Sequence, residues 1–242
     1  MDKEQILKRQ NEIDKEIREI WGVSGALDGI TDIDTYLKNE LHTLWILKEP
    51  NRDALEKENF NQREFNKIGS GWATATYTNI MKTMIGIREY GASDGNIKLM
   101  EEDLPPLAIE PGNRDFKFYI SEMDGQIFPM DEIALINVNK GIAGKKSDDS
   151  FIAAQYNRPE IRNIILEQVE YINPKLIIVC NHVEKLLCDL AGIESITEYT
   201  DADEGTKYFN TGERLIISTG HPMAKNSKKY CNSILDIVYN EI

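Results

Sequence analysis

Four short apolar runs divide the chain and predict the strands of a sheet. They lie at residues 43–47, 133–138, 176–180 and 215–219. The last three runs are rich in β-branched residues and show no regular alternation with polar positions. This pattern is typical of strands that are buried on both faces of a parallel sheet. We therefore expect the four runs to be parallel neighbours.

Segments with apolar residues at helical spacing separate or follow these runs. They cover residues 77–88, 158–172, 183–191 and 227–239. Pro159 suits the first turn of the second segment. Parallel strands need crossover connections, which are usually helices. The alternation therefore predicts an α/β domain with helices on both faces of the sheet.

Residues 1–42 are expected to form a helical segment packed on the core. Four isoleucines within residues 2–20 fall near one helical face, and Lys, Glu and Arg fill the rest. These residues are Ile6, Ile13, Ile17 and Ile20. Packing on the core is the favoured interpretation, and self-association through this face is the alternative. Asp34 is predicted to cap a short helix that runs through Leu41.

Residues 43–242 are predicted to form a single α/β/α domain. The pattern breaks at about 91–131, where several glycines and four prolines occur, and we interpret this stretch as an insertion. Within it, residues 116–120 and 126–128 are predicted to pair as a hairpin across an Asp-Gly turn.

An acidic composition narrows the possible partners. The 242 residues include 28 Lys and Arg against 41 Asp and Glu, so the formal net charge is −13. This balance disfavours indiscriminate binding to nucleic acid or anionic lipid but leaves room for a local basic patch. A membrane-spanning helix needs about 18 consecutive apolar residues, and no apolar run in the sequence is nearly that long. The N-terminus is too charged for a signal peptide. No membrane partner is expected, and the oligomeric state is not predicted.

Cysteine usage points to a reducing compartment. Cys180, Cys188 and Cys231 cannot all pair, and none lies in a Cys-x-x-Cys motif. This argues for the cytoplasm and against a disulfide framework. Three cysteines are also too few to hold a four-cysteine iron–sulfur cluster. We expect all three to be structural.

Candidate chemistry follows the strands, because ligands of open parallel sheets bind beyond the carboxyl ends of the strands. Glu49, Asn137, His182 and His221 come at or just after the ends of the four runs. Several lysines share these loops or the segment after them: Lys140, Lys145, Lys146, Lys225, Lys228 and Lys229. We expect the lysines to form a positive patch that contacts phosphates, with solvated side chains as the alternative. His182 is expected to be structural.

The sequence does not match three known functional motifs. The segment 141–147 has glycines three apart rather than five, so it is not a phosphate-binding P-loop. The chain contains no Gly-x-Ser-x-Gly nucleophile elbow. His42, His182 and His221 lack the spacing of a zinc site, so no metal is expected.

Taken together, the strand ends resemble the uracil-DNA glycosylase superfamily. The matching segments are LKEPN at 47–51, ALINVNK at 134–140, NRPEI to YINPKLIIVCN at 157–181, and TGHPMAKN at 219–226. They occur in the family's order, and the helix that begins near Ala75 is similar as well. The resemblance implies a three-layer α/β/α fold with a central four-stranded parallel sheet.

The resemblance also implies roles for single residues. Glu49 stands where the family positions the attacking water, and Pro50 and Asn51 beside it belong to the implied substrate-binding set. His221 matches the histidine that stabilises the oxygen of the leaving uracil. Asn137 matches the asparagine that reads the edge of the base.

Further positions are implied less directly. Trp72 is expected to stack on the base, and Phe65 is the second choice. Met223 replaces a serine of the family's second motif and can serve in place of the leucine that some members wedge into the duplex. Lys48 and Asn181 also depart from the family's motifs.

The implied activity is hydrolysis of the N-glycosidic bond of a damaged or deaminated base in DNA, a DNA-repair reaction that needs no cofactor. Such enzymes take the nucleotide out of the stack into a pocket. The expected partner is DNA, single- or double-stranded, or a nucleotide-like ligand. Two alternatives stay open. One is a catalytically inert nucleic-acid- or nucleotide-binding module on the same fold. The other is a nucleoside- or nucleotide-processing enzyme, which tolerates the acidic charge better.

Overall fold

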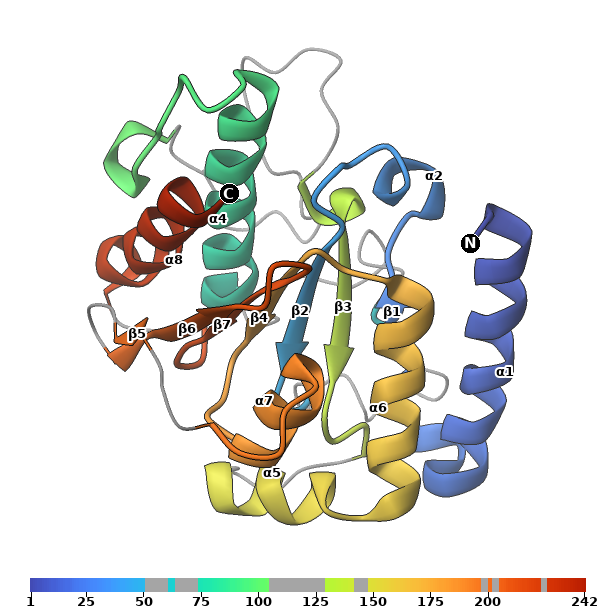
Figure 1. Cartoon of the computed structure of the whole chain (residues 1–242). Coiled ribbons are helices and arrows are strands. Elements are labelled where there is room, and N and C mark those ends of the chain that lie inside the picture. Colours follow the sequence, from blue (N-terminus) through green and yellow to red (C-terminus); the bar gives the residue numbers. More distant parts are fainter. Residues whose placement is uncertain are drawn as a thin grey trace.

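A computed structural model gives the arrangement of the chain in space (Figure 1). The structure describes residues 1–50, 61–63, 74–104, 129–141, 148–196, 200–201, 205–222 and 226–242. The hairpin predicted within the insertion lies outside these residues.

The described strands form one mixed sheet in the order β1-β3-β2-β4-β7-β6-β5. Their bounds are β1 Gly29–Ile30, β2 Thr43–Leu47, β3 Ile133–Asn137, β4 Leu176–Val179, β5 Thr200–Asp201, β6 Lys207–Asn210 and β7 Leu215–Ser218. The four strands predicted from the apolar runs are β3, β2, β4 and β7, and they are parallel neighbours.

The sheet is larger than the four strands expected, because antiparallel strands extend both sides. β1 pairs with β3, while β6 pairs with β7 and β5 with β6. β1 and β5 have two residues each, which is too short for a recognisable pattern. β6 is only partly buried, so it lacks the continuous apolar run of the central strands.

Helices cover both faces of the sheet, as the alternation predicts (Figure 1). The longer helices are α1 Lys3–Trp21, α4 Thr74–Ala92, α5 Asp149–Tyr156, α6 Pro159–Ile172, α7 Glu184–Ala191 and α8 Ser227–Glu241. The short ones are α2 Ile33–Tyr36 and the 3-10 turns η1 Gly22–Ser24, η3 Glu101–Asp103 and η4 Pro129–Glu132. α4 and α8 pack on one face, and α1, α2, α5, α6 and α7 lie on the other.

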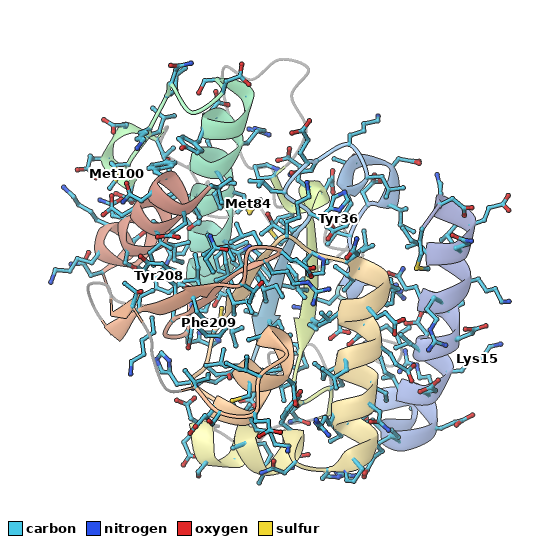
Figure 2. The ribbon with its side chains drawn as sticks, in the orientation of Figure 1. Lys15, Tyr36, Met84, Met100, Tyr208 and Phe209 are labelled. Atoms are coloured by element: carbon cyan, nitrogen blue, oxygen red, sulfur yellow. The ribbon has the colours of Figure 1, made fainter. Side chains whose placement is uncertain are left out.

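Successive side chains of the central strands point to opposite faces of the sheet, so the core consists of two clusters, one on each face. Trp45 and Ile178 pack with α4 and α8, whereas Leu44 and Ile177 pack with the opposite helices. Met84, labelled in Figure 2, belongs to the α4 side. Both faces are therefore buried, which explains why the central strands are apolar at every position.

The N-terminal helix packs along α6 through its isoleucine face, of which Ile6, Ile13 and Ile17 are buried. Asp2 caps it by accepting a hydrogen bond from the Gln5 N–H at 2.9 Å. The isoleucine face of this helix therefore packs on the core, as the favoured interpretation predicts.

The cap predicted for the next helix is wrong by two residues. Asp32, not Asp34, accepts the hydrogen bond from the Thr35 N–H, at 2.8 Å. The helix is then only four residues long and ends at Tyr36 rather than at Leu41. Both of its apolar residues, Ile33 and Tyr36, are buried, and burial of these side chains fixes where the single turn begins.

Among the described residues, no helix is both long and apolar enough to cross a membrane. The three cysteines are free and buried.

Candidate functional site

The loops after β2 and β3 leave the sheet side by side. The Val138 N–H donates to the Leu47 carbonyl at 3.0 Å, and the Asn139 N–H donates to the Lys48 carbonyl at 2.9 Å. These bonds continue the parallel ladder past the last strand residues. Glu49, which is half-buried, and buried Pro50 follow directly. The structure thus brings the Glu49 loop next to the loop that begins at Asn137.

The loops after β4 and β7 form the other half of this edge. The Thr219 N–H donates to the Val179 carbonyl at 2.9 Å, which ties the start of the His221 loop to β4. β4 lies between β2 and β7 in the sheet. The Glu49 and His221 loops are therefore two strand spacings apart, which is about 10 Å between strand axes. The loop after β4, which begins at Cys180, lies between them.

His221 is a neutral imidazole at physiological pH. Burial, with a smaller effect from the charge of Lys48, lowers its pKa from 6.5 to about 4. A neutral imidazole has one nitrogen that donates a hydrogen bond and one that accepts. His221 is therefore suited to donate a hydrogen bond without transferring a proton.

The His221 loop is held by α4 and α8. The Asn79 amide nitrogen donates to the Pro222 carbonyl at 2.5 Å, and the Ser227 hydroxyl donates to the Asn79 amide oxygen at 2.6 Å. Asn79 is 2% exposed, so its two polar atoms depend on these partners. This side chain links the start of α8 to the residue that follows His221.

Lys48 is a residue of this edge that our site prediction omitted. It forms an ion pair with Asp149 at 2.8 Å, and its side chain is 19% exposed. Its charge contributes to the lowered pKa of both His182 and His221, although burial is the larger cause in each case. The available signal in the sequence was its place directly before Glu49 at the end of a buried strand.

His182 is exposed, and its ring is hydrogen-bonded to β7. Its Nδ1 lies 2.7 Å from the Ser218 hydroxyl, which itself donates to the Asn181 carbonyl at 3.0 Å. Because the hydroxyl hydrogen is used there, Nδ1 of His182 acts as the donor.

Asn137 belongs to a buried polar cluster, which we call the Asp28 network: Asp28, Asn137, Lys140 and Gln168. Asp28 accepts hydrogen bonds from the backbone and side-chain nitrogens of Asn137, at 2.7 and 3.1 Å. It also accepts two from Lys140, at 2.8 and 2.9 Å, and one from Gln168 at 2.8 Å. All four residues are buried.

The phosphate-contacting role predicted for Lys140 is wrong. Its side chain is 0% exposed and its ammonium group also donates to the Asn137 carbonyl at 2.9 Å. Burial lowers the pKa of Lys140, and the neighbouring Asp28 opposes this shift. Its partner Asp28 directly precedes β1, a short antiparallel strand that the sequence pattern did not predict. Without that partner, a lysine just after a strand end is expected to be exposed.

Two other predicted lysines are exposed at the start of α8, Lys228 and Lys229. Lys228 pairs with Glu102 at 2.9 Å. The remaining predicted residues lie outside the described part of the chain: Asn51, Phe65, Trp72, Lys145, Lys146, Met223 and Lys225. The structure therefore places the loops of Glu49, Pro50, Asn137 and His221 at one edge of the sheet. A shared site for their side chains, the positive patch and the stacking residue stay predictions.

A groove of about 680 Å³ lies between α5 and α7, below the same edge of the sheet. Its charged lining residues are Glu184, Lys185, Asp189 and Glu194. Three carboxylates against one ammonium do not suit a phosphate, so we do not assign this groove to a nucleic acid. Within the described ranges, no group of three or more His, Cys, Asp or Glu side chains is arranged to hold a metal ion.

In comparisons with known proteins, no protein-family model and no curated protein matches the chain.

Proposed function

We propose that this chain is a divergent member of the uracil-DNA glycosylase superfamily that hydrolyses the N-glycosidic bond of a damaged or deaminated base in DNA. The observation that carries the proposal is the strand order β3-β2-β4-β7. This order supports it because the loops with Asn137, Glu49 and His221 then leave the sheet at the same edge. In the family, the motifs at these positions serve base recognition, water positioning and leaving-group stabilisation.

The proposed reaction separates charge between base and sugar. As the bond breaks, its electron pair goes to the base, and positive character develops on the sugar. Neutral His221 donates a hydrogen bond to the base oxygen where the negative charge collects. A preorganised donor of this kind in a water-poor site is worth about 3–4 kcal/mol.

Water completes the reaction. Glu49 orients the water, whose oxygen bonds to the anomeric carbon, and a water proton ends on the released base. Glu49 is half-buried at a strand end, which suits a carboxylate that orients water near the reacting sugar. Its contribution is smaller than that of His221, because backbone groups and other side chains also orient water.

A nucleoside- or nucleotide-processing enzyme is the second candidate. The burial of Lys140 removes one cation from the predicted patch, and Lys228 is paired with Glu102. With a net charge of −13, this favours a small ligand that does not bring a long phosphate backbone.

An excision panel separates these candidates. The purified chain is incubated with single- and double-stranded oligonucleotides that contain uracil, hypoxanthine, xanthine or a thymine mismatch, and with the matching free nucleosides. We expect base release from an oligonucleotide, which leaves an alkali-labile abasic site. Release from nucleosides alone favours the second candidate. Absence of release from every substrate contradicts both and leaves the inert binding module.

A further inference from the structure

A buried amide holds the turn that carries His221. The Asn79 side-chain nitrogen donates to the Pro222 carbonyl at 2.5 Å, and the Asn79 side-chain oxygen accepts from the Ser227 hydroxyl at 2.6 Å. A carbonyl oxygen only accepts hydrogen bonds, so the nitrogen of the amide must face Pro222 and its oxygen must face Ser227. Asn79 is 2% exposed, so the orientation of its amide depends on the hydroxyl of Ser227.

The Ser227 hydroxyl has a second acceptor within reach. The side-chain oxygen Oε1 of Glu101 lies 3.3 Å from the hydroxyl oxygen. A hydroxyl carries one hydrogen, so Asn79 and Glu101 compete for it. The shorter distance, 2.6 Å against 3.3 Å, shows that Asn79 receives the hydrogen. The contact between Asn79 and the turn is therefore secure only while Glu101 is the weaker acceptor.

Lys82 makes Glu101 the weaker acceptor. The ammonium group of Lys82 donates to the same Oε1 of Glu101, and the two side chains are only 18% and 15% exposed. An oxygen that already accepts from an ammonium group attracts a hydroxyl hydrogen less than an uncompensated carboxylate does. Without Lys82, a charged and largely buried carboxylate remains beside Ser227, and hydrogen bonds to charged groups are about twice as strong as neutral ones. The hydroxyl then turns from Asn79 to Glu101.

These residues come from three elements that pack on one another. Asn79 and Lys82 lie one helical turn apart on α4, Glu101 begins η3, and Ser227 begins α8. η3 packs against both helices. The backbone N–H of Glu101 donates to the side-chain oxygen of Asn232 on α8 at 2.8 Å. Glu101 is therefore held beside Ser227 by a contact that does not depend on Lys82.

We infer that Lys82 is a positioning residue for His221 and acts through its ion pair with Glu101. The ion pair leaves the Ser227 hydroxyl to Asn79, and the Asn79 amide then fixes the turn that carries His221. We call this chain of contacts the Glu101 relay. A hydrogen-bond donor stabilises a developing charge best when it is held in place before the reaction. Lys82 therefore adds to the rate of base release without touching the base, and only this consequence rests on the proposed function.

Side-chain hydrogen exchange tests the Glu101 relay without any substrate. In the wild type the Asn79 amide hydrogens should exchange with solvent at least about tenfold more slowly than those of exposed Asn240. Lys82→Met should make exchange at Asn79 at least about threefold faster, because the amide loses the hydroxyl that orients it. Loss of a nearby cation by itself slows base-catalysed exchange, because less hydroxide is attracted. A faster rate therefore reports the loosened amide.

Two further variants show whether the effect passes through Glu101 and Ser227. Lys82→Met/Glu101→Gln removes both charges of the ion pair, so exchange at Asn79 should return to within about twofold of the wild type. Ser227→Ala removes the hydroxyl itself, so exchange should be fast. Adding Lys82→Met to Ser227→Ala should then change the exchange rate little.

The control is Lys98→Met, which removes another cation close to the same helices. The Lys98 ammonium donates to the Tyr239 carbonyl at 3.1 Å. This variant should leave exchange at Asn79 as it is in the wild type.

Single-turnover excision measures the consequence for the proposed reaction. On the base that the wild type releases, Lys82→Met should lower the maximal rate about tenfold and change the Kd of the substrate less than about twofold. Lys82→Met/Glu101→Gln should restore the rate. Lys98→Met should keep the wild-type rate.

Several results overturn the inference: unchanged exchange at Asn79 in Lys82→Met, no restoration by Glu101→Gln, or an equal effect of Lys82→Met with and without the Ser227 hydroxyl. Faster exchange in Lys82→Met together with a wild-type excision rate overturns it as well. If exchange follows the Glu101 relay but the wild type releases no base, the positioning of the turn stands and the proposed glycosylase is rejected instead.

Discussion

His221 shows how a single environment sets the chemistry of a residue. Its pKa of about 4 follows mainly from burial and also from the charge of Lys48. We expect the imidazole signals of His221 to titrate near pH 4 in an NMR experiment, well below the ordinary 6.5. Lys48→Met should move this midpoint upward, because one cause of the shift is removed. A wild-type midpoint near 6.5 contradicts the lowered pKa and the burial that causes it.

Glu132 offers a second test at the residue scale, through stability. Burial raises its pKa from 4.5 to about 7, against the opposing effect of Arg88. A carboxyl group with a raised folded-state pKa stabilises the fold below about pH 4.5, and this contribution is lost as the pH rises through about 7. Glu132→Gln should therefore be more stable than the wild type at pH 8, by up to about 3 kcal/mol, and the gain should vanish near pH 4.

Urea unfolding at both pH values measures this difference. The control is Glu170→Gln, which removes an exposed carboxylate on α6 and should show no such gain at pH 8. A pH-independent effect of Glu132→Gln disagrees with the raised pKa.

The sequence predicted where the four central strands end, but not the surroundings of each side chain at those ends. Asn137 was predicted to be a site residue because it ends a buried apolar run. Lys140 occupies a similar loop position, yet it points inward because Asp28 is buried opposite it. That pairing joins residues 112 positions apart, and no local pattern encodes it.

At the scale of elements, the central strands and long helices were predictable because their burial is complete and periodic. The edge strands β1, β5 and β6 were not, since they are short or half-exposed. The α2 cap was misplaced because two aspartates, Asp32 and Asp34, compete within three positions and only tertiary burial of Ile33 decides between them.

Because α4 packs closely against α8, alanine substitutions at two glycines of α4, Gly86 and Gly91, should change the stability in opposite directions. A β-carbon on Gly86 meets Leu235 at 2.7 Å, whereas one on Gly91 meets nothing within 4 Å. Gly91→Ala should stabilise the protein by up to about 1 kcal/mol through helix propensity. Gly86→Ala should destabilise it by about 1–3 kcal/mol, because the added methyl group requires buried Leu235 to shift.

The two variants are compared by their free energies of unfolding in urea. Stabilisation by Gly86→Ala contradicts the close helix contact described above.

For the whole molecule, the net charge opposes the binding of DNA. The net charge is −13, and among the predicted patch residues that the structure describes only Lys228 and Lys229 are exposed. Binding to DNA therefore needs a concentrated local patch that outweighs the overall repulsion.

Salt dependence measures that patch. Lys228→Gln/Lys229→Gln should weaken DNA binding and reduce the slope of log K against log salt by about one to two. The matched control is Lys8→Gln/Lys15→Gln on α1, on the other side of the molecule, where Figure 2 labels Lys15. An equal loss in both double variants shows a general charge effect and no patch.

The central claim is that His221 stabilises the departing base at this edge of the sheet. The decisive measurement is the single-turnover excision rate of His221→Ala on whichever base the wild type releases, beside Glu49→Gln and the control His182→Ala. We predict a loss of about 10²–10³-fold for His221→Ala, a smaller loss for Glu49→Gln, and little change for His182→Ala. A wild-type rate in His221→Ala contradicts the account.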